Sequence, residues 1–155
     1  ASHCISNSKE TNIPIFLRVF DEQGIEVTTY QYTAKLVARD AKHDVAILQL
    51  TFGDYIFEPV KINTTPVKYG DVVYTVGNPY MFSRTISRGN VTKATYRDWF
   101  LTDSFMAPGI SGGACLNAQG ELIGLTNLGF GTPGTPWIGA IVRAKYVKDL
   151  LETIE

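Results

Sequence analysis

Ser111 lies in a run of small residues that suits acyl-transfer chemistry. Residues 108–114 read Pro-Gly-Ile-Ser-Gly-Gly-Ala, so three glycines surround one serine. Glycine allows sharp backbone turns in which consecutive N–H groups point the same way and form an anion-binding concavity beside the hydroxyl. Such a concavity stabilises the oxyanion of acyl transfer, and the amides of Gly109 and Ser111 are its natural donors. A simple glycine-rich β-turn has the same composition, so the motif needs supporting residues elsewhere in the chain.

A serine nucleophile needs a base, and the chain has only two histidines, His3 and His43. The hydroxyl is a weak nucleophile until a base removes its proton, and a carboxylate must fix the tautomer of that base. Because adjacent residues of an extended chain point to opposite faces, His43 should face away from a site that contains Asp44. His3 is then the remaining base, although a histidine so near a terminus is more often a frayed surface residue. Asp44, Asp40 and Asp103 are the candidate carboxylates.

Short runs rich in β-branched and aromatic residues must position these groups, and Gly, Pro, Asn and Asp separate one run from the next. This pattern predicts an all-β fold, because strands of this spacing form sandwiches or barrels. Turn sequences at residues 21–24 and 117–120 predict two hairpins. The expected strands are residues 15–20, 33–39, 45–50, 72–76, 85–92, 99–102, 121–127 and 137–142, with a further strand beginning near Ala114.

Only the C-terminal residues have a helical pattern. Val147, Leu150, Leu151 and Ile154 are spaced i, i+3, i+4 and i+7. That spacing predicts one apolar face on a helix over residues 144–154, and such a face usually docks on the rest of the protein. Residues 63–70 contain a proline and lie between two sets of strands, so we expect them to bridge two halves of the fold.

Length and composition exclude several classes of function. A chain of 155 residues corresponds to one domain, and its 14 basic and 15 acidic side chains give a net charge of −1. Because no long run of one charge occurs, the footprint of a nucleic-acid or anionic-membrane binder is missing. No continuous apolar stretch approaches the ~20 residues of a membrane-spanning helix. Two cysteines without a metal-ligand spacing argue against a disulfide framework and against structural zinc.

Three segments resemble the motifs of trypsin-like serine proteases, in the order histidine, aspartate, serine. Ala-Ser-His-Cys at residues 1–4 resembles the catalytic-histidine motif, and Asp-Ala-Lys-His-Asp-Val-Ala-Ile-Leu at 40–48 resembles the aspartate motif. Residues 101–126 are similar to the serine region of bacterial HtrA-type peptidases, which contains Pro-Gly-Asn-Ser-Gly-Gly-Pro-Leu. Residues 76–91 and 138–142 resemble further passages of that domain. The resemblance covers nearly the whole chain.

The resemblance implies a trypsin-like double six-stranded antiparallel β-barrel with a C-terminal helix. Residues 1–62 would be the remainder of the first barrel, 63–70 the inter-barrel linker, 71–143 the second barrel and 144–155 the helix. Family domains have strands before the histidine motif, so we expect an N-terminal segment or a partner chain to complete the first barrel. The resemblance favours an extracytoplasmic or secreted location.

The resemblance also implies residue roles. His3 would be the general base and acid, Asp44 its orienting carboxylate in preference to Asp40 or Asp103, and Ser111 the nucleophile. The amides of Gly109 and Ser111 would form the oxyanion hole. The implied activity is hydrolysis of polypeptides by an acyl-enzyme mechanism without metal or cofactor. The alternative from a different class is an inactive trypsin-like pseudo-protease that serves as a binding or assembly module.

Specificity residues follow from the same resemblance. Phe105, six residues before the nucleophile, would lie at the base of the specificity pocket, where an uncharged side chain cannot select Lys or Arg. Residues 137–140 and the strand Leu125, Thr126, Asn127 and Leu128 would form the mostly apolar walls. We therefore expect cleavage after small or medium apolar residues, with the substrate backbone pairing with this strand by β-augmentation. The resemblance also implies that Cys4 and Cys115 do not pair with each other, since a bridge would cross the cleft.

Overall fold

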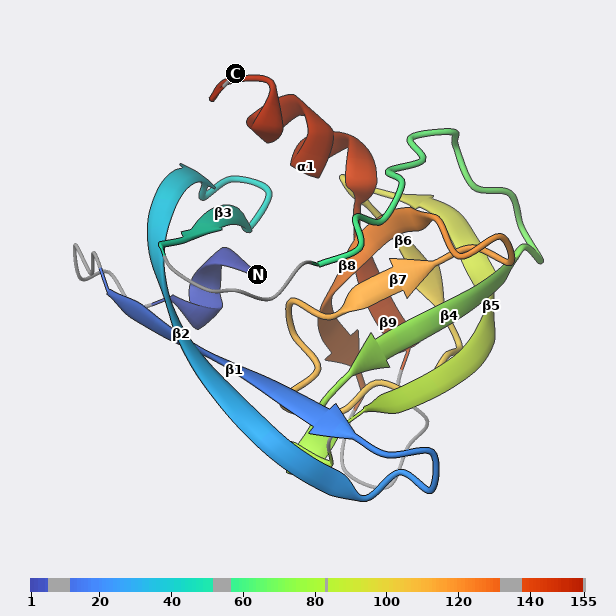
Figure 1. Cartoon of the computed structure of the whole chain (residues 1–155). Helices are drawn as coiled ribbons and strands as arrows, with labels where there is room; N and C mark the ends of the chain where they lie inside the picture. Colours follow the sequence, from blue (N-terminus) through green and yellow to red (C-terminus); the bar gives the residue numbers. More distant parts are fainter. Residues whose placement is uncertain (6–11, 52–56, 83, 132–137, 155) are drawn as a thin grey trace.

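The computed structural model describes residues 1–5, 12–51, 57–82, 84–131 and 138–154, and strands dominate them (Figure 1). The chain divides its strands between an open sheet and a closed barrel, with one α-helix at the C-terminal end. In chain order the elements are η1 (Ser2–Cys4), β1 (Ile13–Phe20), β2 (Glu26–Asp40), β3 (Val45–Leu50), β4 (Val72–Gly77), η2 (Pro79–Met81), β5 (Thr85–Tyr96), β6 (Trp99–Thr102), β7 (Ala114–Leu116), β8 (Leu122–Phe130), β9 (Ile138–Arg143) and α1 (Ala144–Leu151).

The N-terminal half forms a three-stranded antiparallel sheet in the order β1-β2-β3. β1 alternates between half-buried and exposed residues, the pattern of a strand with one face toward the protein and one toward solvent. β2 is the longest strand, and its first six residues are exposed. The first part of β2 is therefore uncovered, whereas β2 and β3 also contact helix α1.

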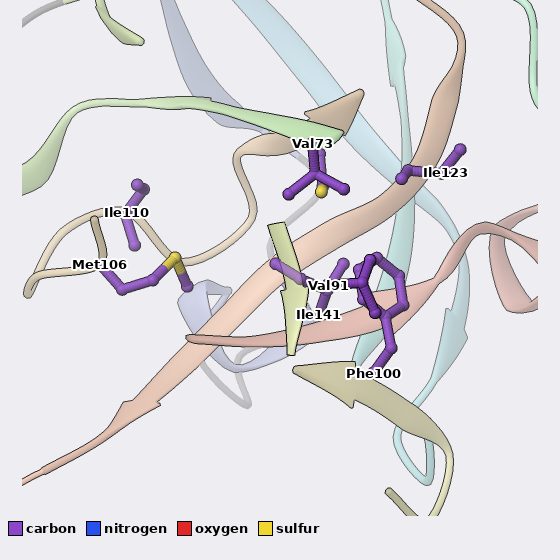
Figure 2. Packing of buried hydrophobic residues seen from close by; sticks show 8 residues of the cluster. Val73, Val91, Phe100, Met106, Ile110, Ile123 and Ile141 are labelled. Carbon is purple, nitrogen blue, oxygen red and sulfur yellow. The ribbon is translucent and has the colours of Figure 1, made fainter. Parts of the chain in front are cut away.

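The second half is a closed six-stranded barrel in the order β4-β5-β6-β9-β8-β7. Closure removes unpaired strand edges and leaves an interior that side chains fill. Figure 2 shows these side chains converging from strands that are distant in the sequence. The cluster consists of Val73, Val91, Phe100, Met106, Ile110, Cys115, Ile123 and Ile141. Two of its members, Met106 and Ile110, come from the loop that carries Ser111, so the barrel core anchors that loop.

Helix α1 joins the sheet to the barrel. It contacts β2 and β3 on one side and β8 and β9 on the other. Val147 is buried in a second cluster with Val45 of β3 and Val142 of β9. Leu150 and Leu151 of the predicted apolar face also pack against this cluster, which couples the two halves. Ile154, the fourth predicted residue, lies beyond the helix and is exposed.

Glu121 fixes the segment between the two halves to the barrel. Its carboxylate accepts hydrogen bonds from the Lys61 ammonium at 2.5 Å and from the Asn63 and Asn117 side-chain amides at 2.6 and 2.8 Å. Ile62 also forms an isolated parallel bridge with Leu122. The three donors lower the pKa of Glu121 to about 2. The linker is therefore held as an ordered strap along the hairpin at 117–121.

The all-β prediction with a closed barrel and a C-terminal helix is confirmed. Of the two barrels expected, the second is closed, whereas the described residues before the linker form the open three-stranded sheet. β2 begins seven residues earlier than predicted because its first residues, Glu26–Gln31, are exposed throughout and have no apolar alternation. Helix α1 ends at Leu151, three residues before the predicted end. Residue 137, the predicted start of the last strand, lies outside the described residues.

Candidate active site

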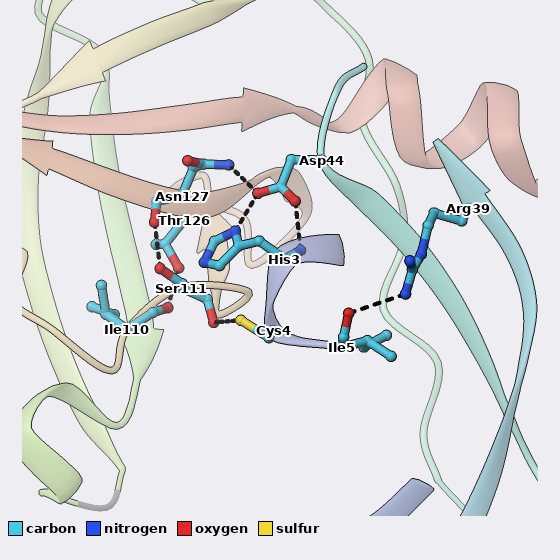
Figure 3. A network of polar contacts seen from close by, with 9 residues as sticks. All are labelled: His3, Cys4, Ile5, Arg39, Asp44, Ile110, Ser111, Thr126 and Asn127. Carbon is cyan, nitrogen blue, oxygen red and sulfur yellow. Dashed lines mark hydrogen bonds and ion pairs between the residues drawn. The ribbon is translucent and has the colours of Figure 1, made fainter. Parts of the chain in front are cut away.

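The structure places His3 directly against Asp44 (Figure 3). The His3 ring nitrogen Nδ1 lies 2.5 Å from one carboxylate oxygen, and the His3 backbone N–H donates to the other oxygen at 2.7 Å. The backbone N–H of Ser2 donates to the Asp44 carbonyl at 2.9 Å. Three contacts thus pin η1 to the turn before β3. With Nδ1 directed at the carboxylate, Nε2 is the ring nitrogen left for a substrate-side partner.

A left-handed backbone at Asp44 directs its side chain into the site. Asp44 has φ of 60°, a conformation that aspartate adopts more readily than most residues. The sequence-based prediction assumed an extended chain here, and the left-handed conformation of Asp44 shows that this assumption was wrong. His43 nevertheless faces away from Asp44 and His3. Its Nδ1 lies 2.5 Å from Asp40, and its ring stacks on Tyr146 of α1 with centroids 3.8 Å apart.

Asn127 supplies a further donor to Asp44. Its side-chain amide donates to the Asp44 carboxylate at 2.7 Å, and the residue is only 4% exposed. Partial burial raises the pKa of Asp44, but hydrogen bonds from His3 and Asn127 outweigh it, so the net pKa lies below the usual value. The carboxylate is therefore ionised at neutral pH and can stabilise a protonated His3. Sequence analysis placed Asn127 among the substrate contacts, and the structure directs its side chain to Asp44.

Ser111 and His3 face the same pocket from opposite halves of the protein. They line a pocket of about 310 Å³ together with Ala107, Pro108, Ile110, Asn127 and Gly129. The Ser111 hydroxyl donates to the backbone carbonyl of Asn127. Among the described residues it makes no hydrogen bond to His3, so a rotation about the serine side chain is needed to form that contact. The Cys4 thiol lies 3.6 Å from the Ser111 carbonyl oxygen on the other side.

The loop around Ser111 is held by backbone contacts that require glycine. A Cβ atom on Gly113 would lie 2.3 Å from the Val76 carbonyl oxygen, and Gly109 adopts φ of 97°. The Thr126 hydroxyl donates to the Ile110 carbonyl at 2.5 Å and fixes the loop to β8. Within the described part of the chain, the amides of Gly109 and Ser111 donate no hydrogen bond, so both remain available to an oxyanion.

The predicted specificity residues are placed in different surroundings. Phe105 is 51% exposed, and its backbone N–H donates to the Ser87 hydroxyl. Leu125 packs toward the α1 cluster, and Thr126 is buried behind the loop. Leu128 lies in β8 opposite Ala140. Phe105, Leu125 and Thr126 are not among the described residues that line the pocket with His3 and Ser111.

The pocket walls come from residues that sequence analysis did not single out. They are Ala107, Pro108 and Ile110, which approach Ser111 along the chain, and Gly129 of β8. Their closeness to Ser111 in the sequence could have indicated Ala107, Pro108 and Ile110, because the residues of a tight loop either face the pocket or anchor the loop. All four walls are apolar and uncharged.

The other candidate carboxylates are engaged elsewhere. Asp40 is paired with His43, and Asp103 accepts a hydrogen bond from the Asn90 backbone N–H at 2.7 Å.

Of the described residues, no group of three or more His, Cys, Asp or Glu side chains is arranged to hold a metal ion. No helix in the described ranges is long and apolar enough to cross a membrane. Cys4 and Cys115 are both free thiols.

Comparison with known proteins identifies the family of the chain. The family model described as "Trypsin-like peptidase domain" matches residues 1–125. The chain is similar to "Serine protease HtrA-like" of Staphylococcus haemolyticus, with 28% identity over 99% of this chain and 25% of that protein. "Serine endoprotease DegS" of Salmonella typhimurium is 37% identical over 64% of this chain and 30% of its own length. "Periplasmic serine endoprotease DegP" of Escherichia coli is 28% identical over 77% and 27%. The chain thus spans about a quarter of the length of the curated relatives it matches.

Proposed function

The chain belongs to the trypsin-like peptidase domain family, and from that premise we propose that it is a serine endopeptidase acting on polypeptides. The observation that carries the proposal is the His3–Asp44 pair, which meets Ser111 across one pocket although the three residues come from distant parts of the chain. His43 is also paired with a carboxylate, that of Asp40, so such a pair alone does not mark a catalytic histidine. What distinguishes His3 is the pocket that it shares with Ser111. The names of the relatives describe proteases of the same family.

In the proposed mechanism, Asp44 holds the His3 ring in the tautomer with the proton on Nδ1. The Ser111 hydroxyl rotates from the Asn127 carbonyl toward His3 Nε2, gives up its proton and attacks the scissile carbonyl. The Gly109 and Ser111 amides stabilise the oxyanion, and His3 then donates its proton to the leaving amine. Water attacks the acyl-enzyme by the same steps and releases the acid product and Ser111.

The pocket supports a preference for small or medium apolar side chains before the scissile bond. Ala107, Ile110 and Gly129 offer apolar contacts and no charge to pair with Lys or Arg. A pocket of about 310 Å³ that must also hold reacting atoms leaves limited room for a bulky side chain. Control of preference by Phe105 stays a prediction, because its side chain is half exposed.

One observation favours an inactive binding module as the second candidate. The Ser111 hydroxyl is bonded to a backbone carbonyl instead of to His3. If that bond persists when a substrate is present, the nucleophile is not activated and the pocket only binds peptide.

Labelling with a fluorophosphonate separates the two candidates. We expect a single adduct on Ser111 by intact mass, lost in Ser111→Ala and at least about 100-fold slower in His3→Ala and Asp44→Asn, because each removes part of one catalytic unit. Asp103→Asn is the matched control, since it removes a carboxylate outside the site, and it should label at the parent rate. An unlabelled parent protein with normal folding would favour the binding module.

A further inference from the structure

A second, larger cavity adjoins the candidate active site. It has a volume of about 790 Å³ and is lined by residues of β1, by Asn78, Tyr80 and Arg84, and by Pro108 and Gly109 of the Ser111 loop. Figure 1 shows the end of β1 beside the loop that joins β4 to β5. Pro108 lines both this cavity and the pocket that contains Ser111, and Gly109 lines the larger cavity. The cavity therefore begins where the scissile carbonyl would bind.

The position of the cavity suits the part of a substrate that follows the scissile bond. The smaller pocket and β8 lie on the acyl side, where an extended peptide can pair with the strand before the scissile bond. Gly109 lines the larger cavity, so a chain whose carbonyl oxygen meets the Gly109 amide has that cavity beside it. If β8 holds the residues before the scissile bond, the cavity is left for the residues after it.

The lining of the cavity combines aromatic surface with positive charge. Phe16 and Tyr80 are 59% and 61% exposed, and Phe20 lies beside them. Arg18 and Arg84 are the charged residues among the described part of the lining, and no acidic residue occurs in that part. An occupant with aromatic and acidic side chains would match both features.

Arg84 is held in place before any ligand binds. Its guanidinium carbon lies 4.5 Å from the centre of the Phe20 ring, and its backbone N–H donates to the Asn78 side-chain oxygen at 3.1 Å. Arg18 lies 3.8 Å from Glu26, and an exposed pair of this kind contributes little to stability. The cavity next to Gly109 is thus lined by two arginines and by three aromatic side chains, those of Phe16, Phe20 and Tyr80.

We propose that this cavity binds the residues that follow the scissile bond and selects peptides with an acidic and an aromatic side chain there. The proposal rests on the proposed peptidase function. The Tyr80 backbone N–H donates to the Pro108 carbonyl at 2.7 Å, so the cavity wall and the Ser111 loop are directly joined. An occupant of the cavity would thereby contact the segment that carries the oxyanion donors.

An acyl-transfer assay measures binding in the larger cavity separately from the catalytic step. An N-blocked alanine thiobenzyl ester acylates Ser111 and releases the thiol, and the acyl-enzyme then reacts with water or with an added peptide amide. In the second case the peptide's amine nitrogen bonds to the acyl carbon, the ester bond to Ser111 breaks, and His3 passes the amine proton to the Ser111 oxygen. Thiol release reports the catalytic residues alone, and the ratio of aminolysis to hydrolysis reports binding in the cavity.

The nucleophiles are Ala-Xaa-Phe amides with Glu, Gln or Lys as Xaa. We expect the aminolysis ratio to be about fivefold higher for Glu than for Lys, as two partly exposed arginines allow. Replacing Phe by Gly in the Glu peptide should lower the ratio about threefold. Arg84→Glu should abolish or reverse the preference, and Arg18→Gln should weaken it independently. Arg88→Glu is the matched control, because it makes the same charge change on β5 outside the lining.

The outcomes separate the two proposals. Thiol release with equal ratios for Glu, Gln and Lys would overturn the selection of acidic peptides and leave the peptidase intact. A preference that survives in both Arg84→Glu and Arg18→Gln would likewise overturn it, since the charge would then come from elsewhere. Absence of Ser111-dependent thiol release would overturn the peptidase proposal and this inference with it.

Discussion

At the scale of single residues, the geometry of the candidate triad depends on a side chain outside it. Asn127 is buried, and its side-chain amide donates a hydrogen bond to Asp44. Its backbone carbonyl accepts a hydrogen bond from the Ser111 hydroxyl. One residue therefore contacts two of the three predicted catalytic groups. This makes Asn127 a positioning residue, because its effect on substrate would pass through Asp44 and Ser111.

Replacing Asn127 by Ala should weaken the orientation of Asp44. We expect kcat/KM, or the fluorophosphonate rate, to fall about tenfold, in line with loss of one hydrogen bond to a charged group. Loss of a donor that lowers the pKa of Asp44 should also raise that pKa, so the titration profile of the Asp44 carboxyl, followed by NMR, shifts to higher pH. Asn90→Ala removes an amide that donates to the Gly70 carbonyl away from the site, and it should leave the profile unchanged. An Asn127→Ala profile identical to that of the parent would contradict the positioning role.

The residue types of the site were predictable from the sequence, but their environment was not. Only two histidines exist, and the motifs select His3, Asp44 and Ser111. The left-handed backbone at Asp44 and the burial of Asn127 depend on contacts between segments that are more than 40 residues apart. No local pattern encodes such contacts.

At the scale of elements, helix α1 and the turn before β3 are joined through His43. The ring stacks on Tyr146, pairs with Asp40 and lies 3.9 Å from Asp98, whose carboxylate also accepts the Tyr146 hydroxyl at 2.9 Å. The helix, the turn and the β5–β6 hairpin therefore meet at one imidazole. The helix was predictable from its apolar spacing, whereas this polar junction has no sequence signal beyond the residues themselves.

Replacing His43 by Ala should destabilise the protein by about 1–3 kcal/mol, because the aromatic stack and the partner of Asp40 are lost together. The free energy of unfolding from urea titration measures the effect. Lys145→Ala, an exposed change on the same helix, should stay within about 0.5 kcal/mol of the parent. A His43→Ala protein as stable as the Lys145→Ala control would show that the junction is dispensable.

The strap formed by Lys61, Asn63 and Glu121 predicts a dependence of stability on acid. The pKa of Glu121 is lowered to about 2 in the folded protein, so its stabilising effect is complete above the ordinary value near 4 and is lost as pH falls through 2. Glu121→Gln should therefore lose less stability than the parent between pH 4 and 2. Urea midpoints across that range, with Glu152→Gln as a control for an exposed helix glutamate, give the comparison. Parallel curves for parent and Glu121→Gln would refute the assignment.

At the scale of the whole molecule, the two halves differ in how completely they are enclosed. The barrel has a closed strand order and a buried cluster that includes Phe100 and Ile141, whereas the first residues of β2 are exposed. The sequence indicated strands in both halves, and the family resemblance indicated the barrel. The resemblance also indicated an incomplete first barrel, and the described residues before the linker form an open sheet. The register of that sheet could not be predicted, because it depends on which edges find partners and not on the propensity of any strand.

Hydrogen exchange should follow this difference. Amides of β6 and β9 should exchange only by global opening, while those at the start of β2 should exchange through local opening at much lower free energy. Peptide-resolved mass spectrometry at several denaturant concentrations distinguishes the two modes. Equal protection of β2 and β9 would show that helix α1 couples the halves into one cooperative unit.

The two thiols differ in accessibility, so one of them can be labelled selectively with a fluorescent dye. Cys4 is exposed at 3.6 Å from the Ser111 carbonyl oxygen, whereas Cys115 is sealed inside the barrel, where burial raises its pKa to about 12. A maleimide dye should therefore attach once to the native protein and twice after denaturation, as counted by mass. A dye on Cys4 would lie beside Ser111 without any engineered substitution, so its emission could follow ligands entering and leaving in real time.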